Sequence, residues 1–176
     1  MNIMDALLGE HGVLYAEIDY LEGTLGDAQA VVDVQASLAF LAAGIQSHSH
    51  LEDELLFENV ERHIGAANGV VRSMRRMHAD IDATFERLQE ATDLDTARAI
   101  ASSAAALARE HFSAEEEVCF PLAEDTVPRD QLLRLGETWA ERRGSAASDS
   151  SGQTPQYLRA HRFEHSLERL EVLCKS

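Results

Sequence analysis

The chain has 176 residues, enough for one well-buried domain and an appendage. Its 45% apolar residues and three prolines fit an ordinary globular protein. The formal charge of −16 argues against nucleic acid or an anionic membrane as partners, because both are bound through Lys and Arg. Two cysteines cannot form a disulfide framework, and we see neither a signal sequence nor a membrane-spanning run. We therefore expect a cytoplasmic protein.

The first predicted element is an amphipathic helix over residues 4–25. Apolar residues recur there at alternating steps of three and four, which is the spacing of one helix face. His11 falls within this apolar face. Gly23 and Gly26 loosen the end of the helix, and Asp27 is a candidate N-cap for the next one.

A long second helix follows, with an apolar face over residues 31–59. His48 and Glu52 keep the rhythm of that face. His50 lies about 200° around the helix from His48, because each residue advances by about 100°. We therefore expect His50 and Glu54 to face solvent.

The third predicted helix has its apolar face over residues 71–88, and this face includes His78. A fourth face over residues 100–122 includes His111 and Glu115. Pro121 should bend or end the fourth helix near its last turn, since proline lacks the N–H and clashes with the preceding turn.

Four helices joined by short loops pack most simply as an antiparallel up-down-up-down bundle. We therefore expect an all-α fold, with a four-helix bundle over residues 1–126. The histidines fall early to midway in the first and third helices and later in the second and fourth. Because neighbouring helices run in opposite directions, all four histidines can meet at one level of the core.

Additional C-terminal helices are expected after the bundle. Residues 127–142 read as a short helix, 143–155 as a flexible linker rich in Gly and Ser, and 156–176 as a final helix. The final helix could serve as a surface for a protein partner or for self-association. His161 and His165 project from the side opposite its apolar face, so a surface role or opportunistic metal binding is expected.

Two segments repeat each other at a constant offset of 63 residues, which indicates an internal duplication. Residues 48–57 and 111–120 both read His-x-x-x-Glu-(x)4-Phe. On a helix, a residue and its neighbour four positions later lie on the same face, so the imidazole and the carboxylate can reach a common point. His11 and His78 add one lone histidine to each half.

The inward-facing set comprises four imidazoles and two carboxylates: His11, His48, Glu52, His78, His111 and Glu115. A single histidine on an apolar face is usually a hydrogen-bonded core residue. Burying the whole set is costly, however, unless its members are paired or bind cations. Nitrogen and oxygen donors without a thiolate disfavour structural zinc and suit iron or manganese.

Six protein ligands from two repeats are many for a single ion. Two ions, with both glutamates bridging them, fit the set better. That arrangement leaves positions for a solvent-derived oxo or hydroxo bridge and for an external ligand such as O2. Tyr15 and Asp82, one turn after His11 and His78, could hydrogen-bond that ligand or line the opening, and Asp82 could bind metal. Alternatively, Tyr15 is an aromatic residue at the edge of the bundle and Asp82 is a solvated carboxylate. Cys119 is expected to be a small core residue.

These motifs resemble the hemerythrin-like (HHE cation-binding) family over roughly residues 4–124. The resemblance rests on the combination of Glu10-His11, His48-x-x-x-Glu52, His78 and His111-x-x-x-Glu115-(x)4-Phe120-Pro121. It implies an antiparallel four-helix bundle around a non-haem di-iron centre that binds O2 or related small molecules. The ligands it implies are His11, His48, Glu52, His78, His111 and Glu115.

Two departures from the family pattern bear on the chemistry. Classical oxygen-carrying hemerythrins have His-x-x-x-His on the third helix, where this chain has Asp82 at the second position. Their fourth helix supplies an Asp ligand, where this chain has Glu115. A more open centre should react with O2, peroxide or nitric oxide more readily than it carries O2 reversibly.

The sequence supports three functional hypotheses. The favoured one is a di-iron protein that binds O2 or another small oxidant, such as peroxide or nitric oxide, for sensing, storage or detoxification. The second is a di-iron enzyme that decomposes peroxide or acts as an oxygenase. The third is an iron donor or iron-responsive regulator, in which the C-terminal helix is the moving part or partner surface.

Overall fold

The structure, a computed structural model, describes residues 1–65 and 69–149, and every regular element in these ranges is helical. This confirms the predicted all-α class. The elements are α1 (Ile3–Thr24), η1 (Leu25–Asp27), α2 (Val31–Glu52), η2 (Asp53–Phe57), α3 (Glu58–Ile64), α4 (Gly69–Gln89), α5 (Leu94–Ala114), η3 (Glu115–Cys119), α6 (Phe120–Thr126) and α7 (Arg129–Asp149). Within the described ranges, no helix has the length and apolarity needed to cross a bilayer.

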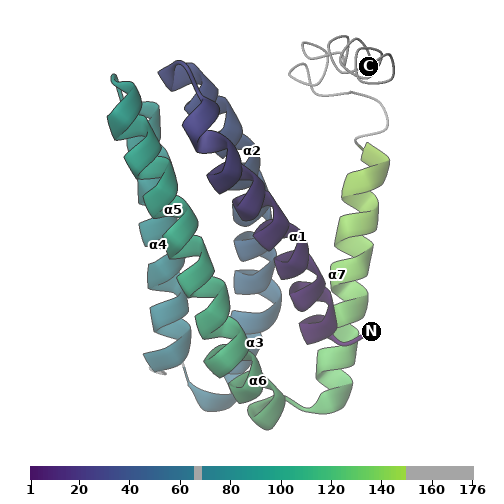
Figure 1. Cartoon of the computed structure of the whole chain (residues 1–176). Helices are drawn as coiled ribbons and strands as arrows, with labels where there is room; N and C mark the ends of the chain where they lie inside the picture. The colour runs from purple at the N-terminus through teal and green to yellow at the C-terminus, as the bar shows by residue number, and fades with distance from the viewer. Residues whose placement is uncertain (66–68, 150–176) are drawn as a thin grey trace, which may run out of the picture. The chain divides into compact units, whose positions relative to one another are not determined.

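Four long helices, α1, α2, α4 and α5, lie side by side (Figure 1). The short helices α3 and α6 continue α2 and α5 beyond the turns η2 and η3. The chain divides into two compact units, residues 1–139 and residues 140–176, and the four long helices all belong to the first. Of the second unit, the structure describes only the end of α7.

Polar side chains fix where the helices begin. Asn2 accepts a hydrogen bond from the Met4 amide at 3.2 Å, and Asp5 accepts one from the Asn2 amide at 3.0 Å, a capping box at the start of α1. Asp93 accepts from the Thr96 amide at 2.8 Å and caps α5. Each such cap is worth about 1 kcal/mol.

The start of α2 differs from the sequence prediction. Asp27, the expected N-cap, lies in the 3-10 turn η1, and α2 begins at Val31. Asp33 accepts hydrogen bonds from the backbone amides of Gln29 and Ala30 at 3.0 and 2.9 Å. These bonds satisfy the amides before the first turn, so the helix begins later than an Asp27 cap would place it.

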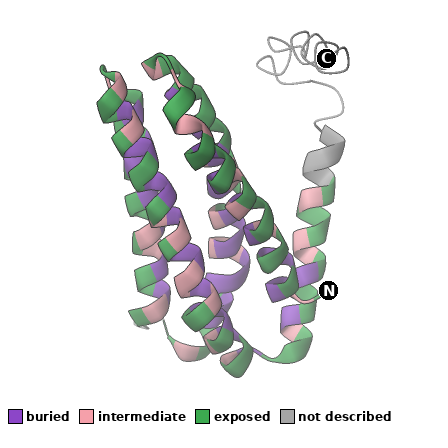
Figure 2. Ribbon diagram, in the orientation of Figure 1, coloured by how far each residue is buried: buried purple, intermediate pink, exposed green. Residues whose placement is uncertain are grey.

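The buried residues, which line the inner sides of the helices (Figure 2), form two apolar clusters. Helices α1, α2 and α4 contribute buried residues to both, and α5 reaches the second cluster through its continuation in η3 and α6. The first contains Leu14, Ile18 and Leu21 of α1, Val34 to Ile45 of α2, Ile81 to Leu88 of α4 and Ala97 to Phe112 of α5. The second contains Ile3 to Leu7 of α1, Leu51 to Val60, Val71 and Met74 of α4, and Cys119 to Ala123. On α1, α2 and α4 the predicted histidine lies between residues of the two clusters, and on α5 His111 directly precedes Phe112, the last residue that this helix adds to the first cluster. The histidines therefore form a polar layer inside an apolar core.

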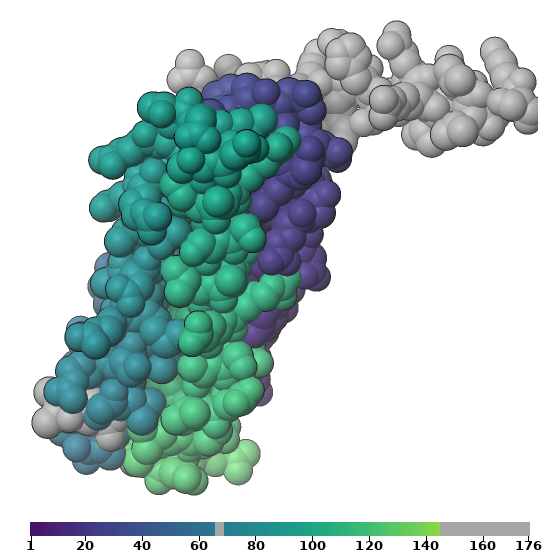
Figure 3. All heavy atoms as spheres, turned by 60° about the vertical axis from the view of Figure 1, so that its left-hand side comes forward, coloured from purple at the N-terminus to yellow at the C-terminus, as the bar shows by residue number. Residues whose placement is uncertain are grey.

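Figure 3 views the face formed by α4 and α5, whose side chains pack against each other along the helices. Five alanines of α5 are completely buried in the first cluster: Ala97, Ala101, Ala104, Ala105 and Ala108. Small side chains let helix backbones approach closely, since little volume separates them. The alanine-lined face of α5 therefore packs closely within the first cluster.

The second and fourth predicted helices are each interrupted by a π-helical turn. The turn η2 begins directly after Glu52, and η3 begins at Glu115. In η2 the Glu58 amide donates to the Asp53 carbonyl, and in η3 the Phe120 amide donates to the Glu115 carbonyl, five residues back in each case. The wider turn adds a residue and rotates the helix beyond it. Val118 lies three residues after Glu115, a spacing that places it on the predicted apolar face of residues 100–122, but it is 49% exposed because of this turn.

Cys119, the last residue of η3, and Phe120, the first of α6, are buried, which confirms Cys119 as a core residue. Pro121 occupies the second position of α6, where its missing N–H costs little, and the helix continues to Thr126. The interruption expected at Pro121 therefore lies earlier, in the π-helical turn η3, and the chain remains helical through Pro121.

The C-terminal prediction is corrected in one respect. The helix expected to end at residue 142 continues as α7 to Asp149, into the segment 143–155 predicted as a linker. The sequence there contains two alanines and only one glycine, and a single glycine costs a helix about 1 kcal/mol. The rest of that segment, the predicted helix at 156–176, and His161 and His165 lie outside the described residues.

Candidate metal centre

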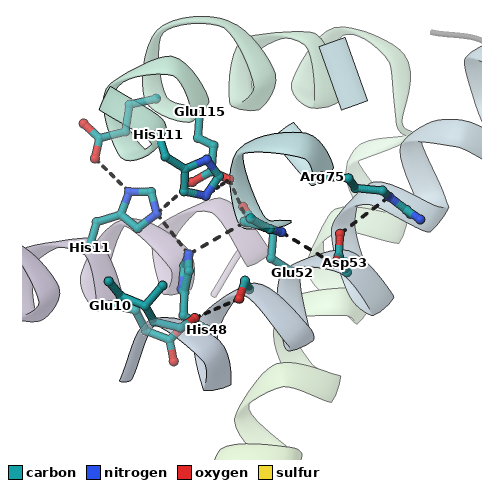
Figure 4. A network of polar contacts seen from close by, with 12 residues as sticks. Glu10, His11, His48, Glu52, Asp53, Arg75, His111 and Glu115 are labelled. Atoms are coloured by element: carbon teal, nitrogen blue, oxygen red, sulfur yellow. Dashed lines mark hydrogen bonds and ion pairs between the residues drawn. The ribbon is translucent and has the colours of Figure 1, made fainter. Parts of the chain in front are cut away.

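The structure brings together the six predicted metal-binding side chains, inside the polar layer between the two apolar clusters. They are His11, His48, Glu52, His78, His111 and Glu115, and none is more than 8% exposed. They come from α1, α2, α4, α5 and the first residue of η3. Figure 4 shows the imidazoles of His11, His48 and His111 directed toward the two glutamates.

The donor atoms fall into two groups that share a carboxylate. Glu52, His78, His111 and Glu115 form one group, and His11, His48 and Glu115 form the other. Within each group the donor atoms lie within 4.8 Å of one another. Among the described residues, these are the groups of three or more such side chains that could hold a metal ion.

Each glutamate faces histidines of both groups. The Glu115 carboxylate places Oε1 3.0 Å from Nε2 of His111 and Oε2 3.3 Å from Nε2 of His11. Glu52 Oε2 lies 3.5 Å from Nε2 of His78 and 3.8 Å from Nε2 of His48. A carboxylate placed in this way can contribute to two coordination spheres.

The spacing of His11 and His48 fits a shared cation. Their Nε2 atoms lie 3.1 Å apart, while Nδ1 of each ring lies within 2.9 Å of a carboxylate oxygen. If both Nδ1 atoms donate to those carboxylates, two Nε2 lone pairs face each other, so a proton or a cation must lie between them. Metal–nitrogen bonds of roughly 2.0–2.1 Å at right angles would place two such nitrogens about 3 Å apart.

Unsatisfied polar atoms also fit a cation. Both carboxylate oxygens of Glu52 and Glu115, and both ring nitrogens of His78 and His111, are buried without a directed hydrogen bond within the described residues. Leaving such groups unmatched costs about 1–3 kcal/mol each, and more for charged ones. Metal coordination would satisfy the carboxylate oxygens and one nitrogen of each ring, so the donor set suits metal cations.

The protonation of these groups is strongly perturbed. Burial raises the pKa of Glu52 to about 7, and the neighbouring Glu115 carboxylate adds to the effect. Burial by itself would lower the pKa of His78, but Asp53 and Glu52 outweigh it and raise that pKa to about 10. By contrast, burial and the positive charge of His78 lower the pKa of His111 to about 3.

Carboxylates outside the six-residue set contact three of the histidines. Glu116 Oε1 lies 2.8 Å from Nδ1 of His11, and Glu10 Oε2 lies 2.9 Å from Nδ1 of His48. Asp53 Oδ2 lies 3.5 Å from Nδ1 of His78. None of these carboxylates was predicted as a site residue, and Glu10 entered only as part of the Glu10-His11 motif. Their only sequence signal is that each directly precedes or follows a member of the set.

Phenylalanines hold the imidazole rings from the apolar side. Phe112 stacks on His11 with ring centroids 4.5 Å apart, and Phe120 stacks on the same ring at 5.5 Å. Phe57 stacks on His78 at 5.7 Å. The two phenylalanines of the repeated motif therefore each cover a histidine of another helix. Their rings keep water from the layer and restrict rotation of the imidazoles.

The remaining predicted residues lie around the layer. Tyr15 is half-buried, with its ring edge-on to Phe112 at 5.5 Å and the Arg109 guanidinium 5.9 Å from its centroid. Asp82 accepts a hydrogen bond from Gln46 at 3.0 Å and belongs to neither donor group. His50 and Glu54 face solvent as predicted, with side chains 73% and 37% exposed, and Nε2 of His50 lies 3.3 Å from Oε1 of Glu54.

A comparison with protein-family models identifies the family. The model described as the hemerythrin HHE cation binding domain matches residues 2–123. Comparisons with curated proteins and with solved structures gave no match. The matched segment covers more than half of the chain and contains all six clustered side chains. The chain therefore belongs to the hemerythrin HHE cation-binding domain family.

Proposed function

We propose that this chain is a non-haem di-iron protein that binds O2 or a related small oxidant, such as peroxide or nitric oxide, for sensing, storage or detoxification. The observation that carries the proposal is the position of Glu52 and Glu115, each between histidines of both donor groups. Two cations that share both carboxylates would each gain two imidazoles and two carboxylate oxygens. Such mixed nitrogen and oxygen sets suit iron.

The proposed ligands are the six buried side chains, held by an antiparallel up-down-up-down bundle. The order of the apolar clusters supports this topology. Helices α1 and α4 pass from the second cluster to the first, whereas α2, and α5 with its continuation η3 and α6, pass from the first to the second. Iron, when bound, would supply reversible redox chemistry and coordination positions for the small ligand.

The residues around the layer would select the ligand by size. The stacked rings of Phe112 and Phe120 and the two apolar clusters cover the donor atoms, none of which belongs to a residue more than 8% exposed. A diatomic molecule or peroxide can reach such a site through small fluctuations of packing, whereas a bulky organic substrate requires a preformed pocket. This burial favours a small ligand over an oxygenase substrate.

Anaerobic reconstitution with ferrous iron followed by exposure to O2 tests the proposal. We expect about two irons per chain and a visible charge-transfer absorption that depends on O2. An absorption that disappears on deoxygenation supports ligand binding, whereas rapid and irreversible oxidation supports a sensor or an enzyme. A freshly purified protein that takes up no iron would contradict the proposal, and transfer of iron to an apo-protein would favour an iron donor.

A further inference from the structure

The four histidines differ in what holds their outer ring nitrogen. Nδ1 of His11 and Nδ1 of His48 each lie at hydrogen-bond distance from a carboxylate, at 2.8 and 2.9 Å. Nδ1 of His78 is 3.5 Å from Asp53 and makes no directed hydrogen bond within the described residues. Nδ1 of His111 is buried and also lacks one there. The two halves of the layer are therefore unequal.

The two close carboxylates reach across between helices. Glu116 lies on η3 and contacts His11 of α1, whereas Glu10 lies on α1 and contacts His48 of α2. Their side chains are 33% and 17% exposed, so each connects the buried layer to the surface. These contacts fix the rings relative to one another as well as to their own helices.

A carboxylate that accepts the Nδ1 hydrogen has two effects on a ligating imidazole. It fixes the tautomer whose Nε2 lone pair points inward, and it increases the basicity of that nitrogen. Removing such a partner typically weakens metal binding by roughly 10–100-fold. Asp53 fixes the ring of His78 less directly, because its Oδ2 lies 3.5 Å from Nδ1 and its Oδ1 lies 3.5 Å from Nε of Arg75.

Building on the proposed di-iron function, we propose that Glu10 and Glu116 are positioning residues that make the His11–His48 half the tighter of two metal positions. This half fills first and empties last. The His78–His111 half, without an equivalent pair of hydrogen bonds, holds the more exchangeable ion. The two positions are thus distinguished by their outer carboxylates, although each takes its nitrogen ligands from two histidines.

Anaerobic release of Fe(II) to an excess of a coloured chelator tests this inference on the full chain. The wild type should release iron in two phases of equal amplitude. Variant H78A should keep one ion that leaves at the slow rate, and H11A should keep one ion that leaves at the fast rate. These variants assign the phases to the two halves of the layer.

The positioning residues are tested by E10Q and E116Q. Glutamine keeps the size and a carbonyl acceptor but removes the charge, so the slow phase should accelerate by roughly 10–100-fold while the fast phase stays unchanged. E117Q is the matched control, because Glu117 is exposed and bonds to Ser113 at 2.9 Å. The visible absorption of Co(II)-loaded protein provides a second readout and should shift in E10Q and E116Q but not in E117Q.

Different results would contradict the unequal metal positions and the proposed di-iron function. Release in a single phase, a slow phase assigned to the His78 half, or wild-type release from both E10Q and E116Q would overturn the inference while leaving a di-iron protein. A wild type that binds no iron would instead overturn the proposed function, and the inference with it. Circular dichroism of each variant identifies any change that comes from misfolding.

Discussion

Gly136 of α7 lies directly against the backbone of Met1, at the start of the chain. A Cβ atom at this position would overlap the carbonyl oxygen of Met1 and lie 2.9 Å from the carbonyl carbon of Asn2. These neighbours are backbone atoms that lead into the capping box of α1, so they cannot move aside as a side chain could. The absence of a side chain at residue 136 lets α7 pack against the first residues of the chain.

We therefore expect G136A to lower the free energy of unfolding by about 1–3 kcal/mol, the usual cost of overpacking. Urea unfolding followed by circular dichroism measures this change. G9A is the matched control, since Gly9 is exposed in α1 and a Cβ there meets nothing within 4 Å. Alanine should stabilise that position by about 0.5–1 kcal/mol. Equal changes in the free energy of unfolding for the two substitutions would show that the close approach at Gly136 does not affect stability.

A second prediction compares two histidines that are neighbours in sequence but not in space. His48 is 1% exposed within the polar layer, whereas His50 is 73% exposed beside Glu54. H48A should reduce iron content to half or less, because it removes a proposed ligand, and H50A should leave it unchanged. Elemental analysis of freshly reconstituted protein measures the difference. Equal iron content in the two variants would argue against ligation by His48.

The sequence predicted which side chains face the interior because most of the helices keep one period. A repeat of 3.6 residues places His48 and Glu52 on the face that also contains Ile45, and all three are buried. The same period failed after Glu115, because the π-helical turn η3 adds a residue. This is why Val118 is exposed and Phe120 is buried.

The outer carboxylates could not be predicted by the same reasoning. Glu10 adjoins His11 in sequence, yet it contacts His48 of the neighbouring helix. Such contacts depend on the rotation and separation of two packed helices, and the periodicity of one helix contains neither quantity. The length of α7 was also missed, because the Gly and Ser content of its last residues resembles that of a linker.

A third prediction concerns the metal-free protein and the burial of Glu52. Its pKa is raised from 4.5 to about 7 in the folded state, so the folded protein binds this proton more tightly than the unfolded chain does. The resulting stability is present below pH 4.5 and is lost as the pH rises through 7. E52Q removes the ionisable group and should be insensitive to this loss.

Metal-free E52Q should therefore be more stable than the metal-free wild type at about pH 8, by at most about 3 kcal/mol, and the two should converge near about pH 4.5. Thermal unfolding of both proteins across this pH range, in the presence of a chelator, measures the difference. Iron should reverse the order by stabilising the wild type alone. A metal-free E52Q that is less stable at the alkaline end would show that the Glu52 carboxylate is stabilised by its neighbours.

A final prediction concerns protons released when metal binds. The pKa of His78 is about 10, so this imidazole is protonated at pH 7 in the metal-free protein, whereas His111, with a pKa of about 3, is already neutral. Because a metal ligates only the neutral ring, ion uptake must release the His78 proton, and Glu52 adds a fraction of another. For each proton that metal binding releases, the affinity for Fe(II) should fall about tenfold per pH unit as the pH is lowered from about 8 to about 6. Calorimetric titration with Fe(II) in buffers of different ionisation enthalpy counts the released protons. Uptake at neutral pH without proton release would mean that His78 is neutral before metal binds.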